Sequence, residues 1–194
     1  MLLLNLTLEE ALGAIGEGRQ LFYEKVIPKE FRADPNSTYR SGYHWLFRYE
    51  RDLVRQLEPW LKPYRYELIG EKGILAEALS NAFYHGHRKN PKLPIEVRLY
   101  KGTKGIMIRI HDCGTGFNVK KIHANYLKGK TYFHTAGNGF RLMADSKRFG
   151  IFYNSLGTTF HMIYLFDQNW TQMTKDAAYG HDVESHKNLM ANRQ

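Results

Sequence analysis

Hydrophobic and polar residues alternate along four short stretches in the second half of the chain. These stretches are Pro94–Tyr100, Ile106–His111, Arg148–Ser155 and Thr158–Phe166. An alternation with a period of two residues is typical of a β-strand that buries one face. A short glycine-containing turn separates the members of each pair, so the pattern predicts two antiparallel hairpins.

Three longer stretches repeat their hydrophobic residues at helical spacing. The first is Leu8–Phe22, where Thr7 and Glu10 form a capping-box pattern at the start. The second runs from Tyr43 to Leu61, and the third is Glu71–Asn90, which Pro91 ends. The pattern therefore predicts three helices, and all three precede the first hairpin.

The remaining segments have no sustained period. Residues 118–136 are polar and basic and are expected to form a loop, followed by a short helix that reaches Ser146. Antiparallel strands with helices gathered on one face make an α+β protein, here a two-layer α/β sandwich with a mixed, mostly antiparallel sheet. We expect three parts: a helical extension (1–40), a main domain (41–166) and a polar tail (167–194).

Composition narrows the class of protein. The chain of 194 residues is 43% hydrophobic and 24% charged, which is ordinary for a soluble globular domain. No run approaches the roughly 18 apolar residues of a membrane helix, and the N-terminus lacks the basic region of a signal peptide. Cys113 is the only cysteine, so no intrachain disulfide forms. We expect a folded N-terminus and a cytoplasmic protein.

The positive charge is concentrated in one part of the chain. The net charge is +9, and residues 71–166 carry fifteen basic and five acidic side chains. Residues 1–70 carry ten of each sign. A basic surface attracts anions of any kind, including a nucleotide, a nucleic acid or an acidic protein. Charge alone does not choose among them.

Candidate chemistry begins on the helix Glu71–Asn90. At 100° per residue, Glu77 and Asn81 share one edge with Tyr84 and His85, away from the apolar side that faces a core. The simpler explanation is a solvated helix face. Three glycine-containing segments further on favour a functional edge instead: DCGTGF (112–117), AGNGF (136–140) and GTTF (157–160).

Taken together, these segments resemble the ATP-binding domain of the GHKL, or histidine kinase-like, ATPase superfamily, which has the Bergerat fold. The four boxes are ExxxN, DxGxGF, GxG before a helix, and GTxF, and they occur here in the family's order. Within the superfamily, NAFYHG, a short lid and GNGFRLM ahead of GTTFHM are most similar to bacterial anti-sigma-factor serine kinases. The resemblance covers about half of the chain and makes 41–166 the expected ATP-binding domain.

The resemblance implies a role for each box. Asn81 would offer its amide oxygen to the Mg²⁺ that accompanies ATP, and Glu77 would act as the catalytic base. Asp112 would accept a hydrogen bond from the adenine amino group, and Thr158 would complete the adenine contact. Gly114 and Gly116 would let the backbone pass close to the adenine ring, and Phe117 of the same box would also contact the nucleotide. The N–H groups of Gly137 and Gly139 would bind the phosphates.

Simpler explanations stand beside these roles. Asn81 can be a cap or a buried hydrogen-bonding residue, Thr158 a turn residue, and the lysines of the loop solvated charges. The predicted partners are ATP or ADP and a protein, either a sigma factor or an antagonist, with a homodimer as an option. One alternative function is a regulatory module that binds nucleotide without turnover. The other is a nucleic-acid binder, for which no recognised motif is present.

Overall fold

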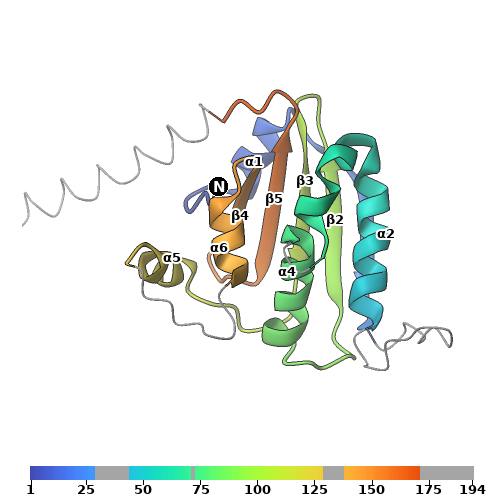
Figure 1. Ribbon diagram of the computed structural model, residues 1–194, viewed down its shortest axis with the longest axis vertical. Coiled ribbons are helices and arrows are strands. Elements are labelled where there is room, and N and C mark those ends of the chain that lie inside the picture. The colour runs from blue at the N-terminus through green and yellow to red at the C-terminus, as the bar shows by residue number, and fades with distance from the viewer. Residues whose placement is uncertain (29–43, 71–72, 129–137, 171–194) are drawn as a thin grey trace, which may run out of the picture.

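The computed structural model describes residues 1–28, 44–70, 73–128 and 138–170 (Figure 1). Helices and strands are interspersed along the chain. In order they are α1 (Leu8–Ala14), β1 (Arg19–Val26), α2 (His44–Leu61), α3 (Arg65–Leu68), α4 (Ile74–Asn81), β2 (Ile95–Lys101), β3 (Gly105–His111), α5 (Val119–Leu127), α6 (Asn138–Asp145), β4 (Phe149–Tyr153) and β5 (Thr159–Leu165). No helix among these residues is long and apolar enough to cross a membrane.

The five strands form one sheet in the order β1-β2-β3-β5-β4, and all neighbouring strands are antiparallel. Both predicted hairpins are confirmed: β2 pairs with β3, and β4 pairs with β5. The α+β class with a mostly antiparallel sheet is also confirmed. The non-consecutive neighbours β3 and β5 place the ends of the two hairpins side by side, with His111 opposite Thr159.

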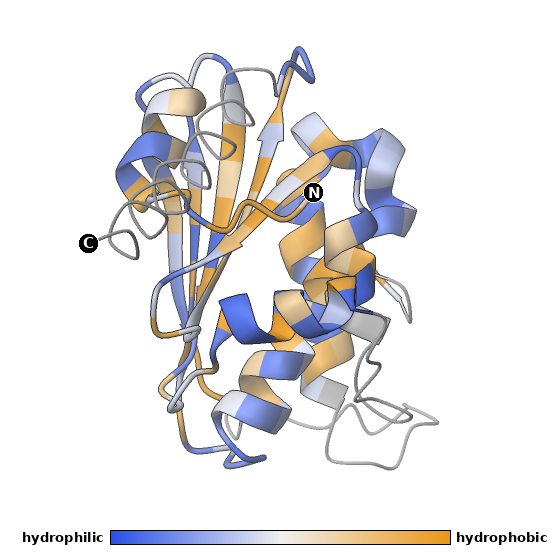
Figure 2. Ribbon diagram, turned by 90° about the vertical axis from the view of Figure 1, so that its left-hand side faces the viewer, coloured by the Kyte–Doolittle hydropathy of each residue, from blue (hydrophilic) through white to orange (hydrophobic). Residues whose placement is uncertain are grey.

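The main core lies between the sheet and the helices α2, α4 and α6, which cover one face (Figure 1). In Figure 2 the hydrophobic side of these helices is turned toward the sheet. Alternate strand residues, such as Ile106, Ile108 and Ile110, are buried there. The helix predicted from Tyr43 to Leu61 is confirmed as α2, whose Leu53 and Leu57 are buried in the same core.

The N-terminal segment differs from the prediction of a helix over Leu8–Phe22. The capping box of Thr7 and Glu10 is present, but α1 ends at Ala14. Gly16 and Glu17 then adopt positive φ angles of 81° and 55°, which stop a right-handed helix. The chain continues as β1, which pairs with β2. The segment is therefore part of the sheet, whereas the predicted boundary near residue 40 lies outside the described residues.

Helix α1 packs on the sheet face opposite the main core. Its Ala11 and the following Ile15 are fully buried with Met107, Ile163 and Leu165 from the strands. A second, smaller core therefore covers part of the outer face, in addition to the helices predicted for the inner face. The N-terminal segment also completes the sheet edge, because the Leu3 N–H donates to the Ile151 carbonyl oxygen at 2.7 Å.

Two further segments refine the predicted elements. The long helix predicted over Glu71–Asn90 is α4, and a π-helical turn continues it over Ala82–Gly86. Residues 71–72 lie outside the described part. The loop predicted over 118–136 instead begins with α5, which Asn118 caps by accepting from the Lys121 N–H at 2.9 Å. Its remainder beyond Lys128, like residues 171–194 of the tail, is not described.

Candidate nucleotide-binding site

A cavity of about 270 Å³ opens between α4, α6 and the ends of the two hairpins. It brings together residues that are far apart in the sequence and that were predicted to form one site. Six of the predicted residues line it: Glu77, Asn81, Asp112, Gly116, Phe117 and Thr158. Gly114 is next to this wall rather than part of it. Small-molecule and cofactor sites have volumes of roughly 300–1,000 Å³, so this cavity lies just below the lower end of that range.

Glu77 and Asn81 stand one turn apart on α4 and line the same wall of the cavity. Both side chains are half-buried. Among the described residues, neither side chain forms a hydrogen bond or an ion pair with another residue. Their oxygen atoms are therefore available to a ligand, and no other structural task is evident for them.

Asp112 is held rigidly at the end of β3. Its N–H donates to the Thr158 carbonyl oxygen at 3.0 Å, and its Oδ1 accepts from the Gly114 N–H at 2.8 Å. Burial raises the pKa of the Asp112 carboxyl above its usual value, and the Gly114 N–H and His111 partly oppose that shift. One carboxylate oxygen is thus fixed by the backbone, while the carboxylate as a whole lines the cavity.

Gly86, the last residue of the π-helical turn, makes room for this carboxylate. A Cβ at Gly86 would overlap Oδ1 of Asp112. The turn itself is closed by the His87 N–H, which donates to the Ala82 carbonyl oxygen at 2.9 Å. π-helical turns are frequent at functional sites, because they displace one residue of a helix locally. Here the turn brings the end of the α4 segment against Asp112.

The second and fourth boxes interlock through their glycines. Gly116 and Gly157 have φ angles of 71° and 72°, a conformation that favours glycine. A Cβ at Gly116 would overlap the Leu156 carbonyl oxygen, and one at Gly157 would overlap the Phe117 carbonyl oxygen. The Phe117 N–H donates to Leu156 at 3.0 Å. The glycines therefore serve the contact between the two loops, and through it the shape of the cavity.

Thr158 is oriented by a residue that the sequence did not single out. Asn154 Nδ2 donates to the Thr158 hydroxyl at 3.0 Å. Asn154 Oδ1 accepts from the N–H groups of Thr158 at 2.9 Å and of Thr159 at 3.0 Å. Because the Thr158 oxygen accepts from Asn154, its own hydrogen is left to donate into the cavity.

Most of the other wall residues are apolar, and sequence reasoning missed them. Ile122 comes from α5, Phe140 and Met143 come from α6, and Tyr153 ends β4. Phe140 ends the AGNGF segment, but no local motif marks the other three positions. A mostly apolar cavity with a few polar groups is typical of small-molecule and cofactor sites.

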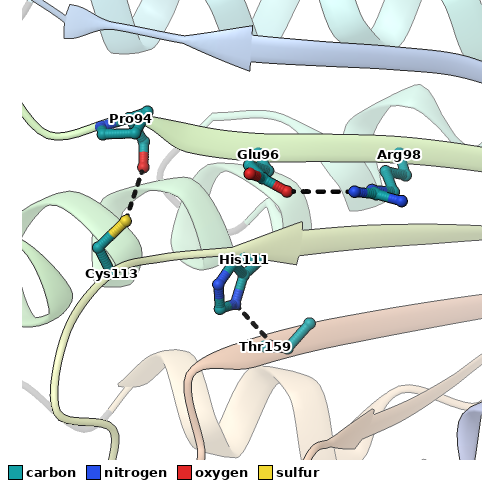
Figure 3. Close-up of polar contacts among 6 residues, drawn as sticks. All are labelled: Pro94, Glu96, Arg98, His111, Cys113 and Thr159. Atoms are coloured by element: carbon teal, nitrogen blue, oxygen red, sulfur yellow. Dashed lines mark hydrogen bonds and ion pairs between the residues drawn. The ribbon is translucent and has the colours of Figure 1, made fainter.

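Behind the cavity, polar contacts hold the ends of β2, β3 and β5 together (Figure 3). His111 Nδ1 and the Thr159 hydroxyl are 2.9 Å apart, and the Cys113 thiol points at the Pro94 carbonyl oxygen at 3.6 Å. Figure 3 also shows the ion pair of Arg98 and Glu96, at 3.3 Å. These contacts lie on the sheet and loop that support Asp112.

His87 also contacts the loop that contains Asp112. It is buried, and its Nε2 accepts from the Cys113 N–H at 3.2 Å. Burial, together with the nearby His111, lowers the pKa of the His87 imidazole. Only a neutral ring can accept this hydrogen bond, and the lowered pKa favours the neutral form. His85, which shares an edge with Glu77 and Asn81, also lines the cavity.

The predicted phosphate end is described only in part. Gly137 lies outside the described residues, whereas Gly139 falls in the first turn of α6. Lys120 and Lys121 of the predicted lid are exposed on α5, and Lys130 is not described. The phosphate-binding roles of Gly137 and Gly139 therefore stay predictions.

Comparison with known proteins agrees with this geometry. Residues 71–146 match the family model described as a histidine kinase-like ATPase domain. The match covers less than half of the chain, and the residues within it are similar to that family. The matched segment contains α4, the first hairpin, the Asp112 loop and α6, which contribute most of the cavity wall. A histidine kinase-like ATPase domain implies nucleotide binding.

A curated relative supports the same assignment. The chain is 29% identical over 121 residues to the "Anti-sigma F factor" of Bacillus cytotoxicus. The similarity covers 60% of this chain and 80% of that protein. The chain is therefore similar to a protein that is named as an anti-sigma factor.

Proposed function

We propose that this protein is an ATP- and Mg²⁺-binding regulator of the anti-sigma type that transfers the γ-phosphoryl group of ATP to a serine of a protein partner. The observation that supports it best is the convergence of three separate boxes on one cavity: Glu77 with Asn81, Asp112 with Gly116, and Thr158. The partner would be a sigma factor or its antagonist, by likeness to the curated relative. The cytoplasm is the matching compartment.

Asp112 and the interlocked loops provide the binding site for adenine in this proposal. A carboxylate accepts hydrogen bonds when ionised, so Asp112 suits the exocyclic amino group of adenine. The Thr158 hydroxyl, with its hydrogen free to donate, suits an acceptor on the same base. The apolar side chains of Phe117, Phe140 and Met143 suit the faces of the ring.

The donor set fits Mg²⁺ held jointly by protein and phosphates. Among the described residues, no group of three or more His, Cys, Asp or Glu side chains could cage a metal. Mg²⁺ in nucleotide sites uses one or two protein oxygens together with phosphates and water. Asn81 would hold it through its amide oxygen, with Glu77 one turn away. The ion would supply neutralisation of phosphate charge during transfer.

Glu77 is the proposed base. A half-buried carboxylate on the cavity wall can take the proton of an incoming serine hydroxyl, within hydrogen-bond reach of the reacting group. The backbone N–H groups at Gly137 and Gly139 and the N-terminus of α6 would hold the phosphates. Positioning and charge neutralisation would supply most of the rate, as in other phosphoryl transfers.

Thermal unfolding with ATP, with and without Mg²⁺, tests the nucleotide site. At about a hundred times its dissociation constant, ATP should add roughly 2.7 kcal/mol to the free energy of unfolding of the wild type. Asn81→Ala should lose the Mg²⁺-dependent part. Asn90→Ala, an exposed asparagine in the loop after the π-helical turn, serves as the matched control. No shift in the wild type would contradict nucleotide binding.

Transfer is tested separately with γ-labelled ATP and purified candidate antagonist proteins. Label on a serine of one antagonist supports the kinase. Tight Mg²⁺-dependent binding of ATP with no label on any sigma factor or antagonist would instead support a regulatory module that binds nucleotide without turnover and docks a partner.

A further inference from the structure

Tyr153 lines the cavity together with the residues proposed to bind adenine. It is the last residue of β4 and stands directly opposite Phe160 of β5. Thr158 precedes Phe160 by two residues, so Thr158 and Phe160 point to the same face of the sheet. Tyr153 is therefore the diagonal neighbour of Thr158 on that face, and all three line the cavity.

The hydroxyl of Tyr153 has a poor acceptor in this structure. It points at Sδ of Met143 at 3.2 Å, and a thioether sulfur accepts hydrogen bonds only weakly. The ring itself is well fixed. Phe117 and Phe160 meet it edge to face, with centroids 5.0 Å and 5.7 Å away. A rigid ring thus holds an O–H donor inside an apolar cavity, where a better acceptor would be worth more than in water.

The surroundings of this donor are acidic on two sides. Burial raises the pKa of the Tyr153 hydroxyl far above its usual value, and the carboxylates of Glu77 and Asp112 add to that rise. The hydroxyl therefore keeps its proton at any physiological pH and acts as a donor toward a ligand. Asp112 on the adjoining wall is the complementary acceptor.

We propose that Tyr153 is a base-recognition residue, whose hydroxyl donates to a ring nitrogen of adenine, directly or through one water, while Asp112 accepts from the amino group. Adenine presents this combination, because acceptor nitrogens N1 and N7 flank the exocyclic amino group. The inference rests on the proposed binding of an adenine nucleotide. It assigns to β4 a contact that lies outside the four boxes of the sequence.

Substitution Tyr153→Phe removes only the hydroxyl and keeps the ring contacts. We expect the affinity for Mg²⁺-ATP, measured by calorimetric titration, to fall roughly three- to tenfold, as for the loss of one neutral hydrogen bond. Tyr100→Phe is the matched control, because Tyr100 is a buried tyrosine on the outer face of the sheet. It should bind ATP like the wild type.

Nucleotide analogues that lack one ring nitrogen identify the contact. If the Tyr153 hydroxyl donates to N1, 1-deaza-ATP should bind the wild type and Tyr153→Phe equally, because that analogue lacks the acceptor nitrogen. If it donates to N7, 7-deaza-ATP should do so for the same reason. 3-Deaza-ATP, altered on the far side of the ring, should still bind the variant more weakly than the wild type.

Three results would be decisive in different ways. If the wild type binds no adenine nucleotide, the proposed function itself fails. If the wild type binds ATP and Tyr153→Phe binds it equally well, the function stands and the role of Tyr153 is refuted. A purely structural bond to Met143 would lower the melting temperature of the variant without nucleotide while leaving its affinity for ATP unchanged, which also refutes the proposal.

Discussion

Asn154 is expected to be the most important polar residue in shaping the fourth box, and its removal gives a quantitative test. Its side chain makes three hydrogen bonds, two from the Thr158 and Thr159 N–H groups and one to the Thr158 hydroxyl. Thr158 and Thr159 are only 7% and 2% exposed. In Asn154→Ala two buried N–H groups lose their acceptor. At about 1–3 kcal/mol for each such group, and with partial relief by water, we expect a loss of about 2–4 kcal/mol.

Urea unfolding followed by far-ultraviolet circular dichroism measures this loss. Asn154→Asp is the matched control, because its carboxylate still accepts from both N–H groups and can accept from the Thr158 hydroxyl. Asp should therefore be close to the wild type in stability, while Ala should also bind ATP more weakly, since Thr158 is no longer oriented. If Ala proves as stable as Asp and the wild type, the hydrogen bonds of Asn154 do not hold the turn, and our account of the Thr158 geometry is wrong.

Two further predictions concern charge. Glu77→Gln should bind Mg²⁺-ATP within about twofold of the wild type, yet lower phosphoryl transfer by roughly 10²-fold or more, because an amide cannot take up the proton; unchanged transfer would exclude Glu77 as the base. The pKa of buried His161 is lowered to about 3, chiefly by burial and then by Arg109. Its neutral form therefore stabilises the fold fully above about pH 6.5, and this stability is lost as the pH falls toward 3. His161→Phe keeps a ring to stack on Phe152, 4.2 Å away, and should flatten the dependence of unfolding free energy on pH over this range; an unchanged slope would contradict the shift.

Local patterns were enough to predict the hairpins and the helix that carries Glu77. Period-two alternation in β2 and β3 reflects a sheet with one face against a helix layer, and that burial is a local signal. The strand β1 could not be predicted in this way, because its partner β2 lies about 70 to 80 residues further along the chain. Leu8–Phe22 has helical spacing throughout, and only the left-handed turn at Gly16 and Glu17 breaks it.

The short helix α5 was missed for a related reason. Four of its nine residues are polar and none of them is fully buried, so its apolar side is too short to mark a helix. It is held by the Asn118 cap and by a tertiary contact, in which the Tyr126 hydroxyl donates to Asp145 of α6 at 2.8 Å. His123 and Tyr126 also pack near the Phe140 ring. Such contacts depend on α6 being in place, which sequence periodicity does not reveal.

In the candidate site, too, some residues could be predicted from local sequence features and others depend on tertiary contacts. Glycines at positive φ and a carboxylate at a strand end are local features, so Asp112, Gly116 and Gly157 could be found from the sequence. Asn154 and Tyr153 owe their places to the register of β4 against β5, which sets Tyr153 opposite Phe160. The sequence therefore located the boxes, whereas the residues that join them needed the fold.

Glu77 connects the fold to the proposed chemistry. A half-buried carboxylate costs stability unless hydrogen bonds or charges compensate it, and among the described residues no hydrogen bond or ion pair does so. Asp112, by contrast, has a backbone donor, and Glu50, which is buried in α2, accepts from the Gly70 N–H at 2.7 Å. Asp112 and Glu50 are thus each compensated by a backbone donor, whereas Glu77 is left for a ligand. A domain that only held nucleotide would gain stability from an apolar residue at that position, so the retained carboxylate favours the kinase over the passive binding module.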